Sequence, residues 1–247
     1  MSNIPGPTIK RFLLRLSMAP LRLIAYLFHA TRLERIYKPR FVRHKALIEL
    51  TINVLDTLPK YSQSISGGKM DPMNLIFIGH ESQLKLRFKQ AGWHRANAAS
   101  PIYLMYGALT VLLGKSHQKG PFTPHYINIG LQDFAFQKLT REQSFKRRHH
   151  IRVWKTGIEL TTGDPVWVGA ASFDSKLKVQ FKPPWIHHFL DPDLDHEREY
   201  IVRDLVQAGS THLKPVAMTK VIFASEPVKN ASGNVYFTDG SAQMVEL

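Results

Sequence analysis

The sequence predicts an α+β fold in which an antiparallel sheet carries helices packed on one face, preceded by a basic amphipathic helix. Short segments of alternating or continuous apolar residues, bounded by Gly and Pro, indicate the strands. Longer segments with helical periodicity and recognisable ends indicate the helices. With 247 residues, 44% hydrophobic and 11% aromatic, the chain can bury one core, as one domain or as a domain with an appendage.

The expected strands have few or no helical signals and are separated by turn residues. They are the segments 74–78, 126–130, 132–137, 148–160 and 166–174. The last two are joined through Gly163, Asp164 and Pro165, a sequence typical of a turn. We therefore expect these two strands to pair as a hairpin.

Two helices have clear boundary signals. Residues 81–91 have apolar positions at helical spacing and are followed by Gly92, a typical C-terminal residue. A second helix is expected to start at Asp191 as N-cap, with Pro192 in its first turn, and to end at Gly209. A weaker helical pattern covers 102–113, where β-branched and aromatic residues also suit a strand.

The N-terminal fifth of the chain holds most of the positive charge. Residues 1–50 contain ten Lys or Arg and two acids, so they contribute +8 of the net +14. Apolar residues of 10–37 alternate with arginines along one helical stripe, bent or broken at Pro20. No apolar run there approaches the roughly 20 residues that span a bilayer, and Arg22 interrupts any secretory signal core.

This segment suits a helix in the membrane interface, with arginines on anionic head groups, or a helix packed on its own domain. The expected lipid contacts are Arg11, Arg15, Arg22, Leu23, Leu27 and Phe28. The proposed organisation is a basic helical region at 1–56, a linker rich in Ser and Gly at 57–70, and a domain at 71–247.

The composition restricts the chemistry of any site. The chain has no cysteine, which excludes disulfides, thiolate ligands and a cysteine nucleophile. A metal site would have to use His, Asp and Glu. The net charge of +14 favours anionic partners, which include a phospholipid surface, a phosphorylated ligand and nucleic acid. Without a recognisable nucleic-acid motif, the third is the weakest of these.

The stretch 187–200 gathers three histidines and five acids in an otherwise basic chain. Asp193 and Glu197 are explained by the preference for acids in the first turn of a helix. Asp191, Asp195 and Glu199 recur every four residues, where like charges repel, so a cation, either arginine or metal, is expected over them. The candidate divalent-metal ligands are His188, Asp191 and Asp195.

The segment 146–154 has a second unusual pattern. Strand alternation places His149, Ile151 and Val153 on one face and a row of Arg148, His150, Arg152 and Trp154 on the other. Arginine forks suit phosphate or carboxylate oxygens, and a histidine between them could transfer a proton. The same row could also be a polar outer face with arginine stacked on tryptophan, or could pair with the acids of 191–199.

Taken in order, several blocks of the chain resemble the bacterial LssY C-terminal domain family. They are 71–79, 91–93, 132–136, 148–154, 165–174, 187–198 and 230–240. The resemblance covers about 71–247. It implies envelope association and phospholipid-related neighbours, because in that family the domain often follows multi-spanning segments of the DedA or phosphatidic-acid-phosphatase type. It implies no reaction.

The expected function is that of a membrane-surface hydrolase acting on an anionic, phosphorylated or lipid-linked substrate, at the bacterial envelope as a peripheral membrane protein. The catalytic candidates are His150, Asp174 and Asp195. The substrate-binding candidates are Arg148, Arg152, Trp154 and Arg198. A non-enzymatic envelope-associated binding module or secretion accessory, a nucleic-acid-binding protein and a cytoplasmic location stay open as alternatives.

Overall fold

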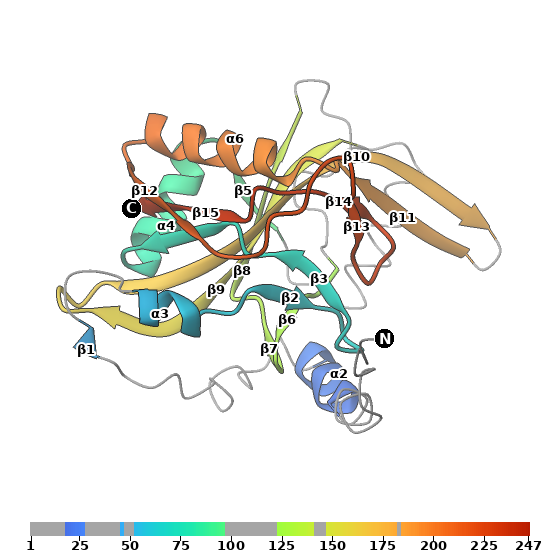
Figure 1. Ribbon diagram of the computed structural model, residues 1–247, viewed down its shortest axis with the longest axis horizontal. Helices are drawn as coiled ribbons and strands as arrows, with labels where there is room; N and C mark the ends of the chain where they lie inside the picture. The colour runs from blue at the N-terminus through green and yellow to red at the C-terminus, as the bar shows by residue number, and fades with distance from the viewer. Residues whose placement is uncertain (1–17, 28–44, 47–51, 97–122, 141–146, 182–183) are drawn as a thin grey trace, which may run out of the picture.

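The computed structural model describes residues 18–27, 45–46, 52–96, 123–140, 147–181 and 184–247 (Figure 1). The weak helix at 102–113, most of the basic region at 1–56, Arg11, Arg15 and Phe28 therefore lie outside the described residues. The side chains of Leu27, His187 and His188 do so as well.

A long, twisted sheet forms the centre of the described structure (Figure 1). Within the described residues it has nine strands, with the order β12-β15-β4-β10-β9-β8-β5 along its main path, while β1 adds to β9 and β11 to β10. The strands are β1 Lys45–Ala46, β4 Leu75–Ile78, β5 His94–Arg95, β8 Phe134–Leu139, β9 Arg148–Leu160, β10 Pro165–Phe181, β11 Pro184–Leu190, β12 Thr211–Ala217 and β15 Ser241–Glu246. Most neighbours are antiparallel, but β15 runs parallel to β4 and β1 parallel to β9, so the sheet is mixed.

The expected hairpin of 148–160 and 166–174 is present as β9 and β10. Its turn reverses at Gly163, whose φ of +87° is a backbone conformation that glycine adopts without a steric penalty. The register pairs Ala171 with Ile151, Ser172 with His150 and Asp174 with Arg148. Because cross-strand partners share a face, this register decides which side chains meet in the candidate site.

Two helices cover one face of the main sheet. They are α4, Glu81–Gln90, and α6, Leu194–Gln207. Leu84 and Phe88 of α4 and Ile201 of α6 pack with Ile151 and Val153 of β9 in one apolar core. The predicted division of β9 into two faces is therefore confirmed on this side.

The opposite face does not match the prediction of helices on one side only. A second core there contains Leu55 of α3, Ile52–Thr57, together with Trp154 and Val168 of the hairpin. A second sheet of the described chain has the order β3-β2-β6-β7. Its strands are β2 Tyr61–Gln63, β3 Lys69–Pro72, β6 Tyr126–Ile127 and β7 Gly130–Leu131. Parts of the expected linker at 57–70, residues 61–63 and 69–70, belong to the strands β2 and β3 of this sheet.

The helix α2, Ala19–Leu27, lies beside β7 (Figure 1). Arg22 is 2% exposed, and its Nε donates to the carbonyl of Asn128 at 2.6 Å and its Nη2 to Gln63 Oε1 at 2.6 Å. The assignment of Arg22 to lipid head groups is thus wrong, because its guanidinium is already hydrogen-bonded within the protein. Leu23, by contrast, is 46% exposed.

Two short strands, β13 Val228–Lys229 and β14 Val235–Tyr236, form a separate small hairpin. Its connection is held to β3, since the amide of Ala231 donates to the carbonyl of Lys69 at 2.7 Å. In the described chain, no helix is long and apolar enough to cross a membrane.

Candidate functional site

A serine, a histidine and an aspartate meet on the face of the main sheet that faces away from α4 and α6. Ser172 Oγ lies 2.8 Å from His150 Nε2, and His150 Nδ1 lies 3.6 Å from Asp174 Oδ1. Cross-strand pairing causes this, because Ser172 is directly opposite His150 and Asp174 is two residues further along the same face. The three residues are almost completely buried. A hydroxyl on one imidazole nitrogen and a carboxylate near the other resembles the arrangement that activates a serine nucleophile, with the carboxylate 3.6 Å away, just beyond hydrogen-bond distance.

Arg148 holds the aspartate of this group. Its Nε donates to Asp174 Oδ2 at 2.8 Å, and its Nη1 donates to Gln137 Oε1 at 3.1 Å. Asp174 thus has one oxygen toward the arginine and the other toward the imidazole of His150. The carboxylate is held in place by an ion pair whose members are at most 5% exposed in their side chains.

The same face continues to Arg152 and to a second buried carboxylate. Arg152 Nη1 lies 3.6 Å from Asp71 Oδ2 at the end of β3, and Asn230 donates to Asp71 Oδ1 at 3.1 Å. His125 Nδ1 lies 3.8 Å from Asp71 and 3.1 Å from the hydroxyl of Ser62. In this second group the hydroxyl and the carboxylate face the same nitrogen, so it lacks the two-sided geometry found around His150.

Burial and charge set the protonation of this network. Burial lowers the pKa of His125 well below its usual value, and the nearby Arg152 and His150 lower it further, so this imidazole is neutral. Burial raises the pKa of Asp71, against the effect of Arg152. Arg148 and Arg152, which were expected to bind an anion, are thus each paired with a carboxylate of their own chain.

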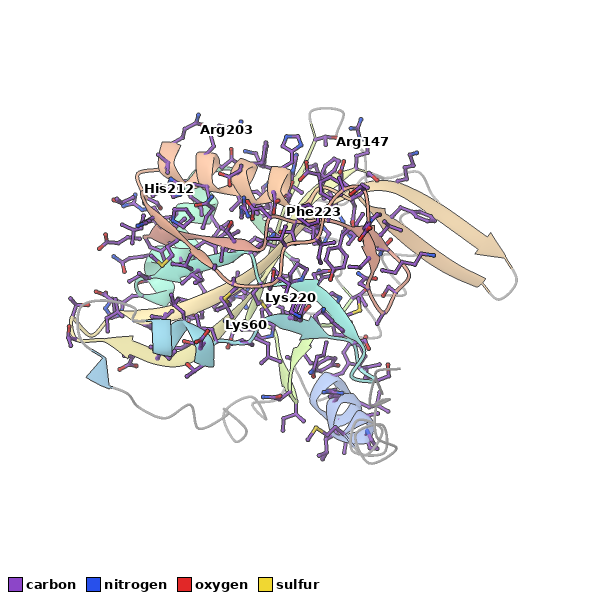
Figure 2. The ribbon with its side chains drawn as sticks, in the orientation of Figure 1. Lys60, Arg147, Arg203, His212, Lys220 and Phe223 are labelled. Carbon is purple, nitrogen blue, oxygen red and sulfur yellow. The ribbon has the colours of Figure 1, made fainter. Side chains whose placement is uncertain are left out.

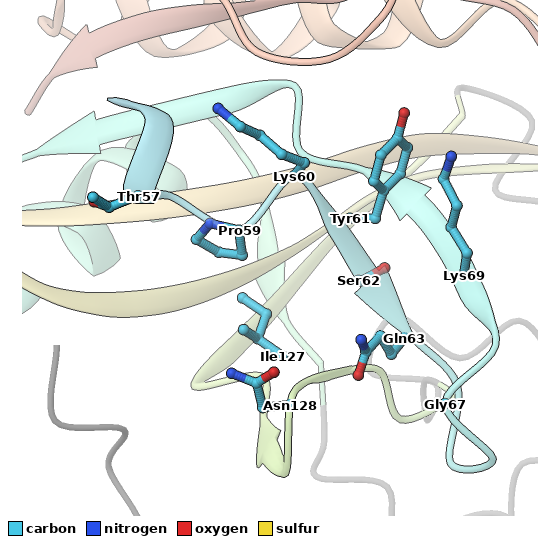
Figure 3. Close-up of a pocket in the computed structure, with 10 residues that line it drawn as sticks. All are labelled: Thr57, Pro59, Lys60, Tyr61, Ser62, Gln63, Gly67, Lys69, Ile127 and Asn128. Carbon is cyan, nitrogen blue, oxygen red and sulfur yellow. The ribbon is translucent and has the colours of Figure 1, made fainter. Parts of the chain in front are cut away.

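A pocket of about 380 Å³ opens beside this network (Figure 3). Its lining comes mainly from β2 and the segment before it, with contributions from β3 and β6, and includes Lys60, Lys69 and Ser62. Lys69 Nζ lies 3.5 Å from the centre of the Tyr61 ring. Ser62 belongs to both regions, because it lines the pocket and its hydroxyl meets His125. Ser62 itself is fully buried, so it separates the pocket from the polar network.

Of the sequence-predicted residues, the structure brings His150, Asp174, Arg148 and Arg152 together on one face of the sheet. Trp154 does not form a wall of the site, because it is 3% exposed and packs in the core with Val168. Its cross-strand partner is the apolar Val168, so this end of the face belongs to the second core.

Asp195 and Arg198 lie elsewhere, where α6 meets the loop before β15. Asp195 accepts hydrogen bonds from Thr238 Oγ1 and the amide of Asp239, each at 2.7 Å, and from Arg198 at 3.1 Å. Arg198 is also paired with Asp239, at 2.8 Å, and Glu199, at 2.9 Å. The assignments of Asp195 to catalysis and of Arg198 to substrate are therefore corrected, because both tie the helix to the next segment.

These contacts also answer the question of the cation over the acidic stripe, because an arginine, Arg198, bonds Asp195 and Glu199. Asp191 accepts from the amide of Asp193, which is the N-cap of α6 in place of the expected Asp191. The side chain of His188 lies outside the described residues. Among the residues that the structure describes, no three His, Asp or Glu side chains are grouped closely enough to hold a metal ion.

Sequence reasoning missed Ser172 as a candidate nucleophile, and it missed Asp71, His125 and Ser62 altogether. Ser172 has a signal in the sequence, because it sits two residues before Asp174 in a strand expected to pair with 148–160. Asp71 and His125 have none, because their approach to Arg152 depends on how the second sheet packs against the first.

The fold and site define a mixed α+β domain with a buried Ser-His-Asp group and a network of paired charges. A model of the LssY C-terminus family matches residues 55–242, so the chain belongs to this family. The match begins before the domain boundary expected near residue 71, in agreement with the position of β2 in the fold. No curated protein and no solved structure matches the chain.

Proposed function

We propose that this domain is a hydrolase that acts at a membrane surface on an anionic, phosphorylated or lipid-linked ester, with Ser172 as its nucleophile. The observation that carries the proposal is the geometry around His150, with Ser172 Oγ at 2.8 Å from Nε2 and Asp174 Oδ1 at 3.6 Å from Nδ1. A histidine placed between a hydroxyl and a carboxylate can take a proton on one nitrogen while the acid stabilises the resulting charge on the other.

The reaction has two balanced steps. Ser172 Oγ attacks the carbonyl carbon or phosphorus of the ester, His150 Nε2 takes the hydroxyl proton, and the imidazolium returns it to the leaving alcohol as the ester bond breaks. Water then attacks the acyl- or phosphoryl-serine, loses its proton to His150, and releases the acid as Ser172 regains its proton. Asp174 orients the ring throughout, and Arg148 holds Asp174.

The preference for an anion comes from the pocket and the arginines together. Lys60 and Lys69 line the pocket, and the guanidinium groups of Arg148 and Arg152 flank His150 on its strand. The two arginines are paired with Asp174 and Asp71, and Lys60 lies 3.9 Å from Asp56, so Lys69 is the pocket cation best placed to meet an anion. We expect the acid group of the substrate to bind toward the pocket and the ester to reach inward toward Ser172.

The proposal is tested with a panel of water-soluble phosphoester, carboxylic ester and peptide substrates, and with a fluorophosphonate that labels activated serines. The wild type should turn over at least one anionic ester, and Ser172→Ala or His150→Gln should lower kcat/KM roughly a thousandfold or more. Ser210→Ala is the matched control, because Ser210 is also a buried serine, 7% exposed, but lies after α6. Absence of both turnover and labelling in the folded wild type would remove the basis of the proposal.

A second function, that of a non-enzymatic binding module, is favoured by one observation. Ser172 is fully buried, whereas the pocket with Lys60 and Lys69 is open to the surface. A module of this kind would bind inorganic phosphate or glycerol phosphate in calorimetry and would lose that binding in Lys60→Ala plus Lys69→Ala. Lys89→Ala, on the exposed side of α4, is the control. Binding that depends on the two pocket lysines, without turnover, would select this function over the hydrolase.

A further inference from the structure

Large apolar side chains stand out from the protein between β12 and β13. Phe223 is 67% exposed and Val221 54%, the two highest fractions among the exposed large hydrophobic residues of the described chain. Val228, at the start of β13, is 38% exposed. We call residues 219–229 the apolar loop. An exposed phenylalanine with an exposed valine two residues away leaves considerable apolar area in water, which is typical of an interaction site.

The apolar loop is held in this form by backbone hydrogen bonds. The amide of Thr219 donates to the carbonyl of Gly240 at 2.8 Å, and Ile222 and Thr238 exchange two backbone bonds at 2.8 and 3.0 Å. Ile222 therefore turns toward the protein and is only half-exposed, while its neighbours Val221 and Phe223 turn outward. A fixed backbone that alternates in this way presents the two apolar side chains on the same side.

Lysines surround these apolar side chains. Lys220 and Lys229 lie within the loop and Lys214 on β12, and all three are exposed. Glu226 is the one acidic residue between positions 214 and 229, so the segment carries a net charge of +2. Apolar side chains at a tip with lysines beside them match an anionic bilayer, where the tip enters the acyl boundary and the ammonium groups meet the head groups.

Both ends of the apolar loop lie beside the pocket. Lys60, which lines the pocket, has its Nζ 3.9 Å from the sulfur of Met218, one residue before the loop. Lys69, also in the lining, contributes its carbonyl to the amide of Ala231, two residues after the loop. Figure 2 shows Lys60, Lys220 and Phe223 in the same region of the molecule. A membrane that receives the loop would therefore lie close to the pocket.

We propose that the apolar loop is a membrane-binding element that inserts Phe223 and Val221 into an anionic lipid surface. Lys220 and Lys229 contact the head groups, and the pocket is brought to the lipid interface. This inference rests on the proposed function in one respect, namely that it names a lipid-borne ester as the substrate. It does not depend on the N-terminal helix, because the residues that carry it lie in 214–231.

The experiment measures binding of the full chain to vesicles by co-sedimentation. One set of vesicles is phosphatidylcholine, and the other is an equimolar mixture of phosphatidylcholine and phosphatidylglycerol. The wild type should bind the mixed vesicles and bind the neutral ones far more weakly. Phe223→Ser should weaken binding to mixed vesicles by roughly tenfold or more, since a phenylalanine side chain leaves the apolar phase. Lys220→Ala should weaken it by about fivefold, the effect of one lysine near a charged surface.

Two control variants lie on α4, far along the chain from the loop. Leu86→Ser removes an apolar residue that is 50% exposed, and Lys89→Ala removes an exposed lysine, so each matches one loop variant in residue type. Both should bind mixed vesicles as the wild type does. Equal loss of binding in the α4 variants and the loop variants would overturn the proposal, as would unchanged binding in Phe223→Ser.

The same variants separate this inference from the proposed function. Phe223→Ser should keep full turnover of a water-soluble ester and lose turnover of an ester carried in mixed vesicles. Ser172→Ala should lose turnover of both and keep vesicle binding. If Phe223→Ser instead abolishes self-association of the wild type measured by light scattering, with no vesicle binding in either protein, the loop is an interface between copies of the chain and the membrane proposal fails.

Discussion

His149 and His150 are adjacent in the sequence, yet β9 places them in opposite environments. His149 faces α6, where its ring stacks on Tyr200 with centroids 3.9 Å apart and its Nδ1 lies 2.7 Å from Glu197 Oε2. His150 faces away from the helices, where Ser172 and Asp174 meet it within a network of paired charges. The strand therefore separates an acid-histidine pair beside the apolar core from a connected polar group that could carry out chemistry.

The two environments also differ in charge. Burial lowers the pKa of His149 to about 4, and it raises the pKa of Glu197 well above its ordinary value, with Asp174 raising it further. The raised pKa of Glu197 and the lowered pKa of His149 both favour the neutral forms of the pair, in which the carboxyl group donates to the imidazole. Around His150 the acidic and basic side chains instead lie in pairs, Arg148 with Asp174 and Arg152 with Asp71.

The largest effect on stability is expected from Arg148→Ala, which removes one of the two buried ion pairs around His150. Removing the guanidinium leaves Asp174 without its 2.8 Å donor in a buried site, so the free energy of unfolding should fall by about 3–5 kcal/mol. Chemical denaturation followed by circular dichroism measures the change. Arg147→Ala, at the exposed residue immediately before β9, is the control and should change stability by less than about 1 kcal/mol. Equal effects of the two would show that the buried ion pair contributes little.

A smaller effect on stability, which depends on pH, is expected from the pair of His149 and Glu197. The pKa of His149 is about 4 in the folded protein and near 6.5 when unfolded, so the unfolded chain takes up a proton first as pH falls from 6.5 toward 4. Stability is therefore lost over this range, by at most about 3 kcal/mol at 1.36 kcal/mol per pH unit. His149→Gln keeps a hydrogen-bond partner for Glu197 and should not show this loss. A stability difference between the two proteins that is constant from pH 6.5 to 4 would contradict the neutral pair.

The pH dependence of stability that Glu197 causes is opposite in direction to that caused by His149. The pKa of Glu197 is higher in the folded protein than in the unfolded chain. Its contribution to stability is therefore complete at a pH below the pKa of the unfolded chain, and it is lost as the pH rises through the pKa of the folded protein. Glu197→Gln cannot ionise and should gain stability relative to the wild type as pH rises. Thermal unfolding at several pH values measures the difference, with Glu199→Gln, at an exposed position of the same helix, as the control.

The smallest effect on stability should come from Ser172→Ala, the change that matters most for activity. It removes one buried hydrogen bond to His150, so the loss should be about 1–2 kcal/mol. Loss of turnover in a protein that still unfolds cooperatively would separate the role of Ser172 in chemistry from its role in folding. A loss above about 4 kcal/mol would instead indicate that Ser172 serves mainly to hold the sheet together.

Local patterns predicted the hairpin and its two faces, because alternation along a strand is a property of consecutive residues. Thus His149 and His150 were placed on opposite faces, and Arg148, His150 and Arg152 in a common row, before their partners were known. The helix α4 and its terminal Gly92, with a φ of +79°, were predictable for the same reason.

Partners distant in sequence were not predictable. Asp71 is 81 positions from Arg152, and nothing local indicates that they meet. Asp195 looked like a metal ligand because its neighbours are acidic, whereas Thr238, Asp239 and Arg198 use its oxygens. Arg22 looked like a surface charge on an apolar helix, and only the fold shows that Gln63 and Asn128 receive it. In each case the partners are more than 40 positions apart in the sequence, or an arginine lies where a metal ion was expected.

The position of β15 has a consequence for folding order. In the chain β15 follows β12, but in the sheet it lies between β12 and β4, parallel to β4 and antiparallel to β12. Until residues 241–246 are added, β4 and β12 each present an open edge, and β4 is a fully buried apolar strand in the finished fold. Exposed edges of this kind recruit other chains. A chain interrupted before residue 241 should therefore aggregate rather than accumulate as a smaller folded unit.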